Sequence, residues 1–175
     1  MDFKDCIRMQ YNFVAEYSHG SLETALKGLT REELVWQPAP NGMSIGLIFF
    51  HQARWMDSYL HSRLQNIPDI WETQGWYKKF NIPVAGVTLR TVKEIAAFVI
   101  PPIEDLRAYE SAARAKILEY IESKTTEDFN EKVDYPFGVY PNLGNLLATM
   151  VCRLGFYVGQ IIYLSRLQRG EIRIG

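Results

Sequence analysis

Apolar residues recur at intervals of three and four along four long stretches of the chain, which is the spacing of one buried helix face. Gly28 and Gly170 are natural stops for the first and last of these stretches. Gly20 weakens the middle of the first stretch, so a bend is expected there. The four predicted helices span about residues 4–27, 44–65, 101–123 and 142–168.

Shorter elements are predicted between the long helices. Thr30 with Glu33, and Thr91 with Glu94, form capping boxes that each open a short helical segment. Residues 68–90 hold several aromatic residues and prolines, and they make a long crossover rather than a tight hairpin. Residues 135–141 could form a short extended pair, but no series of strands is present. The chain is therefore predicted to be an all-α four-helix bundle with a long crossover between the second and third helices, in one domain over residues 1–175.

Composition narrows the range of partners. With 19 Lys and Arg against 20 Asp and Glu, the net charge is −1, which gives no footprint for nucleic acid or an anionic membrane. Cys6 and Cys152 are far apart in the chain and make neither a disulfide framework nor a zinc pattern. The first residues contain acids and no apolar signal region, and the purely apolar runs fall short of the roughly 20 residues that span a membrane. We expect a cytoplasmic protein that binds neither nucleic acid nor membrane.

Common catalytic motifs are absent from the sequence. It contains no GxSxG, HExxH, GxGxxG or GxxxxGK[ST] pattern. Glu16, Asp57 and Glu104 are single acids on predicted helices, and their spacing makes no carboxylate pair. Any catalytic group would therefore have to be assembled by tertiary contacts.

Several longer runs carry a family resemblance. They are LVWQP at residues 34–38, SIGLIFFH at 44–51, WMDSYL at 55–60, IWETQGWYKKF at 70–80 and GQIIYLSRLQRG at 159–170. In this order and spacing they resemble the DinB/YfiT-like superfamily over nearly the whole chain. The resemblance implies a left-handed four-helix bundle that is commonly a homodimer. Many members hold Zn or Ni on three histidines, and some are thiol-dependent S-transferases that use mycothiol, bacillithiol or glutathione.

The family's metal ligands are mostly replaced in this chain. One family histidine, on the second helix, matches His51, and the two that lie four apart on the last helix match Arg153 and Tyr157. Arginine is permanently charged and offers no lone pair, so it repels a metal ion. Tyrosine could coordinate only as phenolate, which is costly for a group whose pKa is ordinarily near 10. We therefore expect no cofactor, with Zn or Ni as the alternative if substitute ligands complete the site around His51.

The other histidines offer little help to such a site. His61 follows His51 by ten positions and is expected on a different face of the helix. His19 could approach only if the register of the bundle allows it.

Each candidate residue has a structural and a functional interpretation. His51 is either a core histidine bonded to a neighbour or part of a pocket. Arg153 either forms an ion pair with Glu16 or Asp57, or clamps the carboxylate or phosphate of a ligand. Tyr157 either packs in the core or directs its hydroxyl at a ligand or at His51.

Three further side chains belong to the same region of the predicted bundle. Trp55 is expected to wall a pocket, and Gln160, three positions after Tyr157, could point toward the same cavity. Cys152 adjoins Arg153, but neighbouring helix positions diverge by about 100°, so we expect a buried, inert thiol.

Two functions remain open. The first is a binding protein or pseudo-enzyme, with a small-molecule pocket between the helices whose polar groups are His51, Arg153, Tyr157 and Gln160. Arg153 would suit an anionic ligand. The alternative is an active thiol-dependent S-transferase or hydrolase, either metal-dependent through substitute ligands or metal-free with His51 as general base.

Overall fold

The computed structural model describes residues 2–16, 22–87, 91–134 and 140–171. These residues form helices and loops, and no strand occurs among them. The helices are α1 (Phe3–Glu16), α2 (Leu22–Leu26), α3 (Arg31–Val35), α4 (Ile45–Ser58), the π-helix η1 (Tyr59–Gln65), α5 (Ile70–Thr73), α6 (Trp76–Lys79), α7 (Val92–Ala97), α8 (Ile103–Glu122), the 3₁₀-helix η2 (Asp128–Asn130) and α9 (Leu143–Arg169).

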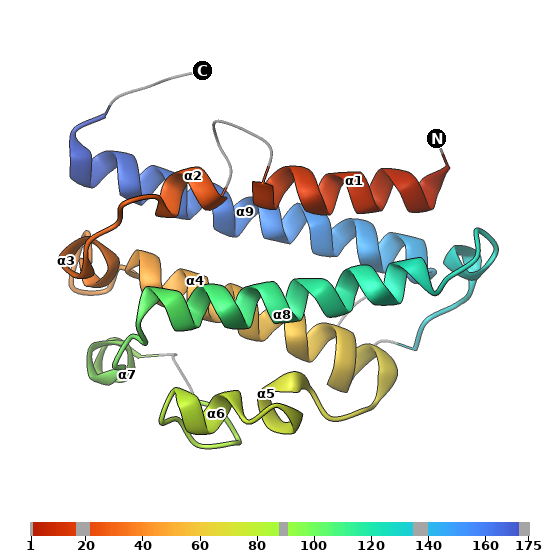
Figure 1. The fold of residues 1–175 in the computed structure, drawn as a ribbon, viewed down its shortest axis with the longest axis horizontal. Coiled ribbons are helices and arrows are strands. Elements are labelled where there is room, and N and C mark those ends of the chain that lie inside the picture. The colour runs from red at the N-terminus through yellow and green to blue at the C-terminus, as the bar shows by residue number, and fades with distance from the viewer. Residues whose placement is uncertain (1, 17–21, 88–90, 135–139, 172–175) are drawn as a thin grey trace.

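The long helices α1, α4, α8 and α9 pack as a bundle (Figure 1). Helix α4 packs against both α8 and α9, while α1 and α2 lie along α9. The core is filled by fully buried aliphatic side chains, each of which contributes about 1.5–3 kcal/mol through removal from water. Examples from three helices are Ile45, Met56, Leu106, Ile117, Ile121, Leu147 and Ile161. The predicted all-α four-helix bundle is confirmed.

Local sequence determines where the helices begin and end. Ser44 Oγ accepts a hydrogen bond from the Leu47 amide at 3.2 Å and so caps α4. Asn142 caps α9 in the same way, through the Asn145 amide at 2.9 Å. At the far end of α9, Gly170 has a φ of 65°, a left-handed conformation that glycine adopts without strain.

The predicted first helix is two helices. Continuous helix was expected over residues 4–27, but α1 ends at Glu16 and α2 begins at Leu22. The predicted bend at Gly20 lies outside the described residues, as does most of the extended pair predicted at residues 135–141. Gly28 ends α2 with a φ of 65°, which confirms the predicted stop.

The crossover contains two short helices, α5 and α6, that the sequence pattern did not reveal, and it is followed by α7, which the capping box at Thr91 predicted. Helices α5, α6 and α7 lie between η1 and α8, on the outer side of α4 and α8 (Figure 1). The capping box at Thr91 opens α7, and α8 begins directly after Pro102. Trp71 of α5 is 1% exposed and packs edge-on against Phe50 of α4, with ring centroids 5.9 Å apart. Aromatic packing of this kind attaches the crossover to the bundle.

The start of α4 depends on one glycine. A Cβ added at Gly46 would lie 2.4 Å from a methyl carbon of Ile100 and 3.1 Å from the Leu34 carbonyl oxygen. The absent side chain therefore lets α3 and the residues before α8 approach α4 closely.

Helix α9 is the one described helix that is long and apolar enough, by length and composition, to cross a membrane. Counting uninterrupted apolar runs in the sequence missed this property. In the fold, α9 packs against α1, α2 and α4, and a helix at the centre of a bundle needs the same apolar composition.

Candidate functional site

His51 and Tyr157 meet where α4 packs against α9. Their ring centroids are 5.5 Å apart in an edge-to-face arrangement, with an angle of 77° between the ring planes. His51 is exposed, and Tyr157 is partly buried. The two positions that the family resemblance paired are therefore neighbours in space.

Trp55 and Arg153 complete the group. Trp55 follows His51 by one helical turn, is 7% exposed, and has its ring centroid 6.1 Å from that of Tyr157. The guanidinium carbon of Arg153 lies 5.7 Å from the Trp55 ring centroid, within the range of a cation–π contact. His51, Trp55, Arg153 and Tyr157, here called the α4–α9 site, thus lie together as predicted. Gln160 is exposed further along α9, and no contact given for the described residues joins it to this group.

The polar atoms of the α4–α9 site lack partners within the described part of the chain. The indole Nε1 of Trp55 is buried and donates no hydrogen bond. No described carboxylate lies within salt-bridge distance of Arg153, and neither His51 nor Tyr157 makes a hydrogen bond to a described residue. A buried donor without an acceptor costs about 1–3 kcal/mol, so this arrangement is unusual for a purely structural cluster.

Burial shifts the titration of both rings toward their neutral forms. Partial desolvation lowers the pKa of His51, so its imidazole is neutral and can accept a proton near neutral pH. Partial burial also raises the pKa of Tyr157, although the nearby Arg153 charge acts in the opposite direction. The phenol therefore keeps its proton and can donate a hydrogen bond.

The α4–α9 site does not fit a metal held in the family's manner. Among the described residues no three His, Cys, Asp or Glu side chains gather in a metal-binding group. His51 would be accompanied by a cationic guanidinium and by a phenol that resists deprotonation. His19 lies outside the described residues.

The geometry excludes two alternatives that the sequence left open and corrects one prediction. His51 is exposed and is not a core histidine. Arg153 does not pair with Asp57, because Asp57 is fully buried among other partners; the side chain of Glu16, the other proposed partner, is not described. Cys152 is exposed rather than buried.

A second polar cluster, around Asp57, was missed. Its carboxylate accepts hydrogen bonds from Tyr109 Oη at 2.7 Å and from the backbone amides of Ile70 and Trp71 at 3.0 and 2.9 Å. His61 Nδ1 lies 2.8 Å from Asp57 Oδ1, and Arg54 Nη1 lies 3.2 Å from Oδ2. Arg54 also contacts Asp69 Oδ2 at 3.1 Å.

The spacing of Arg54, Asp57 and His61 at three and four residues was a usable signal of contacts along one helix face. What the spacing could not show is that α5 would cover this face. The crossover contributes two backbone N–H donors to the Asp57 carboxylate. Three residues that the sequence alone would place on an exposed helix face therefore belong to a buried network.

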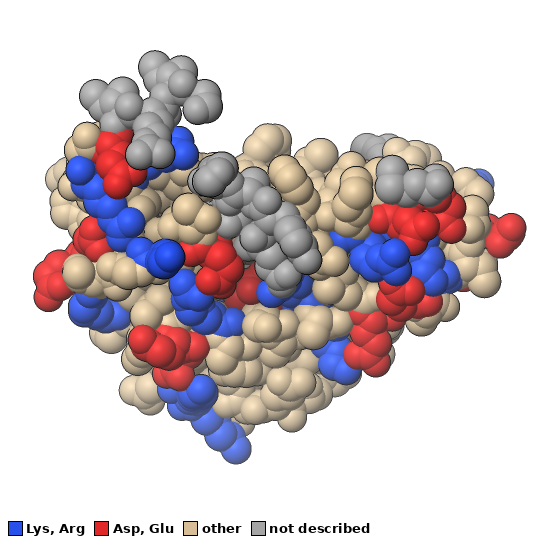
Figure 2. Space-filling view, turned by 45° about the horizontal axis from the view of Figure 1, so that its top comes forward, with Lys and Arg blue, Asp and Glu red and all other residues tan. Residues whose placement is uncertain are grey.

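Three pockets formed by described residues lie elsewhere. One of about 540 Å³ is lined mainly by apolar residues of the crossover, including Phe80 and Phe98, and one of about 400 Å³ lies beside Phe3 and the start of α9. A third of about 400 Å³ lies between η1, α5 and α8. None of these three includes His51, Arg153 or Tyr157. Charged side chains of both signs are interspersed over the face in Figure 2, so this face offers no broad area of one sign for nucleic acid.

Comparison with known proteins gives a consistent family and fold. The family model of the DinB superfamily matches residues 16–152. Among solved structures, a conserved protein from Enterococcus faecalis superposes with a TM-score of 0.76 at 22% identity, covering 97% of this chain and 99% of that one. No functionally curated protein matches. Residues 153 and 157 lie beyond the matched range, so the match does not itself align them with metal ligands.

Proposed function

The chain belongs to the DinB superfamily, and from this premise we propose that its α4–α9 site binds a small anionic molecule instead of a histidine-held metal. The observation that carries the proposal is the buried Trp55 Nε1, which has no hydrogen-bond partner among the described residues and belongs to a group with Arg153, His51 and Tyr157. A ligand with a carboxylate or phosphate would supply acceptors to these donors.

The chemistry of the individual groups favours an anion. The Arg153 guanidinium offers a planar fork of donors, and charge-assisted bonds from such a fork to a carboxylate or phosphate are among the stronger hydrogen bonds in proteins. Trp55 Nε1 and the protonated Tyr157 hydroxyl add neutral donors beside it. The Trp55 and Tyr157 rings favour an aromatic or otherwise flat apolar body attached to the anion.

One specific observation supports an enzyme as the second candidate. His51 is exposed and neutral, so its imidazole could act as a general base toward a thiol or a water molecule. Arg153 would then stabilise developing negative charge. A thiol-transferase or hydrolase activity that His51→Ala abolishes, without loss of ligand binding, would favour this candidate over a pure binding protein.

Ligand binding at the α4–α9 site can be tested with simple probes. Benzoate and phenyl phosphate combine a ring with a carboxylate or a phosphate, and isothermal titration would measure their affinity for the wild type, Arg153→Gln and Arg166→Gln. Arg166 lies on the same helix outside the site and is the matched control. Loss of the Arg153 charge is expected to weaken binding about tenfold, which corresponds to about 1.4 kcal/mol. Arg166→Gln should bind as the wild type does.

A measurement of metal content tests the opposing possibility, that the α4–α9 site holds a metal ion. Plasma mass spectrometry of tag-free protein should find no stoichiometric metal, and Zn, Ni, Mn or a chelator should not shift the melting temperature. Near-stoichiometric Zn or Ni that His51→Ala removes would contradict the proposal and restore a metalloenzyme.

We further propose that the protein is a homodimer through the outer face of α9. Phe156 and Tyr163 are 68% and 66% exposed on this face, which is unusual for large rings that lie one above the other. Gly159 lies between them and Gly155 directly precedes Phe156, and a Cβ added to either glycine would have no neighbour within 4 Å. Packing within one protomer thus gives no reason for glycine, whereas close approach of a second helix would.

A further inference from the structure

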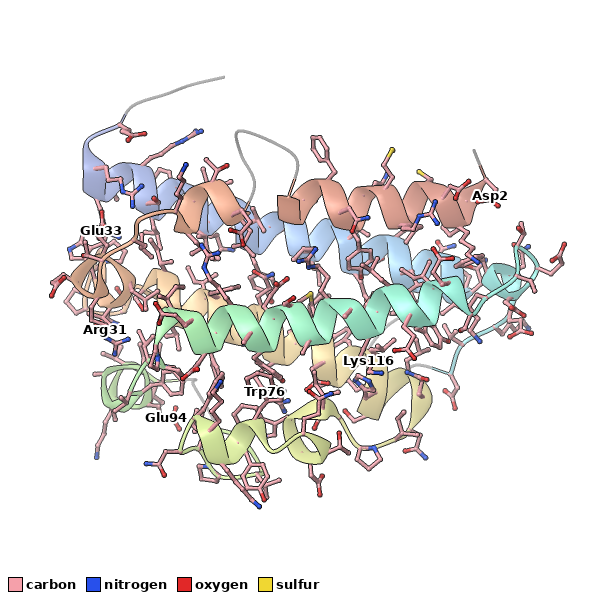
Figure 3. The ribbon with its side chains drawn as sticks, viewed as in Figure 1. Asp2, Arg31, Glu33, Trp76, Glu94 and Lys116 are labelled. Carbon is pink, nitrogen blue, oxygen red and sulfur yellow. The ribbon has the colours of Figure 1, made fainter. Side chains whose placement is uncertain are left out.

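A polar pocket between η1, α5 and α8 contains the outer edge of the Asp57 network. It measures about 400 Å³, a size typical of small-molecule sites. His61 of η1 lines this pocket together with Lys116 and Glu119 of α8. Figure 3 shows Lys116 on the side of α8 that faces η1.

The orientation of His61 is fixed from within the protein. Its Nδ1 lies 2.8 Å from Asp57 Oδ1 and 3.1 Å from the Asp57 carbonyl oxygen, so this nitrogen carries a proton and donates it inward. The side chain is only 8% exposed, and its Nε2 makes no hydrogen bond to any described residue. Since Nδ1 is held by Asp57, Nε2 is the nitrogen left to face the pocket.

Asp57 is unavailable for any other task. Both of its oxygens are occupied, by the amides of Ile70 and Trp71, by Tyr109, by Arg54 and by His61. A carboxylate this well supplied with donors stays ionised and favours the doubly protonated imidazolium. The pocket is thus presented with an N–H donor that is fixed in place.

Lys116 provides a second cationic donor at the pocket wall. Its Nζ lies 2.7 Å from Glu119 Oε2, and both side chains are substantially exposed. Exposed ion pairs within a helix are weak, so an anion entering the pocket can take over Lys116 at small cost. A metal ion is a poorer candidate, because no third metal-ligating side chain gathers with His61 and Glu119 among the described residues.

We propose that the pocket between η1, α5 and α8 is a second ligand site, in which His61 Nε2 and Lys116 Nζ bind the carboxylate or phosphate of a small molecule. This site is separate from the α4–α9 site and does not depend on it.

Anion binding in this pocket is expected to depend on pH, because His61 can gain or lose a proton. Burial alone would lower the pKa of His61, but the bonds to Asp57 outweigh it and the pKa lies above the ordinary value. The charged groups around the ring are Asp57 from α4, Asp69 before α5, and Glu119 and Lys116 from α8. Acetate, whose charge is constant over the neutral range, should therefore bind more weakly as the pH rises through the pKa of His61.

The experiment is a titration of ¹⁵N-labelled protein with acetate or inorganic phosphate, with sodium chloride at matched ionic strength as the reference. Long-range proton–nitrogen correlations report the ring nitrogens, and the chain's 3 histidines can be assigned with His19→Gln and His51→Gln. His61 itself is left intact because the fold uses it. Saturable movement of His61 Nε2 is expected with at least one anion, and the tighter of the two identifies the ligand class.

Matched variants decide whether the response belongs to this pocket. Lys116→Gln should weaken the anion roughly fivefold, while Lys93→Gln, on the exposed part of α7, should leave it unchanged. Arg153→Gln should also have no effect, so failure of the α4–α9 proposal and failure of this one are distinguishable. No saturable shift with either anion, an equal shift with chloride, or an unchanged affinity in Lys116→Gln would overturn the inference.

Discussion

Replacing Asp57 by Asn removes the charge on which the network between α4, α5 and α8 depends. The new amide is nearly the same size, so no cavity forms. The two carboxylate oxygens of Asp57 together receive bonds from Tyr109, Arg54, His61 and two backbone amides. In the Asn variant, one of these oxygens is replaced by an NH₂ group, which cannot accept a bond from the donors that it faces. Asp57→Asn therefore tests the electrostatic part of the network with little change in packing.

The magnitude follows from which partners would be left without an acceptor. Breaking a buried ion pair by removing one partner costs about 3–5 kcal/mol. Arg54 keeps Asp69 at 3.1 Å, and His61 keeps the backbone oxygen of residue 57 at 3.1 Å, so the lower end of this range applies. We expect a loss of about 3 kcal/mol, a large part of the roughly 5–15 kcal/mol that stabilises a typical domain.

Urea unfolding followed by circular dichroism measures this loss. The matched control is Asp105→Asn, which removes a partly exposed partner of Lys79 and should cost less than about 1 kcal/mol. If Asp57→Asn costs no more than the control, the network does not stabilise the fold and the reasoning fails.

The pH dependence of the same measurement has a definite sign. Bonds from His61, Tyr109 and the two amides outweigh the effect of burial and hold the pKa of Asp57 below its ordinary 3.8, so its contribution is present above pH 3.8 and lost as the pH falls through the lowered value. His61 has its pKa raised above 6.5, so its contribution is complete below pH 6.5 and lost as the pH rises through the raised value. The stability difference between wild type and Asp57→Asn should be largest from about pH 4 to 6.5 and should narrow toward pH 9. A difference that grows over this alkaline range would contradict the assigned direction for His61.

Three other predictions concern α4 and α9. Gln52 is 0% exposed and neither of its amide atoms has a partner among the described residues, so Gln52→Leu should stabilise the protein by about 1–2 kcal/mol in urea unfolding; a loss of stability would show that the amide is satisfied. Gly159→Ala should raise the stability of the protomer by about 0.5–1 kcal/mol in dilute solution, yet weaken self-association in sedimentation equilibrium, because the helix gains propensity while the dimer loses close contact. Phe156→Lys should leave melting of the protomer almost unchanged and give a monomer at concentrations where the wild type is dimeric; an unaltered dimer would place the interface elsewhere.

Much of the fold could be predicted because its determinants are local. The caps at Ser44, Asn142 and Thr91, and the stop at Gly170, act within one turn of their own helix. Apolar spacing then identifies the faces that meet in the core. Helices α5 and α6 were not predicted because they are only one turn long, and burial of Trp71 and Phe80 against Phe50 holds them in place rather than intrinsic propensity.

The α4–α9 site was partly predictable for a different reason. Steps of four residues from His51 to Trp55 and from Arg153 to Tyr157 place each pair on one helix face, and the packing of α4 on α9 brings the two pairs together. Exposure was not predictable, because it depends on how far each helix rotates toward its neighbours. Cys152 was consequently assigned to the interior although it is exposed, and the sequence could not decide whether His51 lies in the core or lines a pocket.

Helix α4 carries both polar clusters, and they differ in how well their polar atoms are satisfied. On the side facing α5 and α8, each oxygen of Asp57 has at least two donors, and the network needs no ligand to be complete. On the side facing α9, Trp55 Nε1 has no acceptor and Arg153 has no carboxylate among the described residues. Because an unmet buried donor is costly and a met one is not, the first cluster can stabilise the crossover by itself, while the second is the one for which we propose a ligand. The same reasoning separates the two ring nitrogens of His61. Nδ1 belongs to the completed network, and Nε2, which no described residue engages, is the atom that we propose binds a ligand.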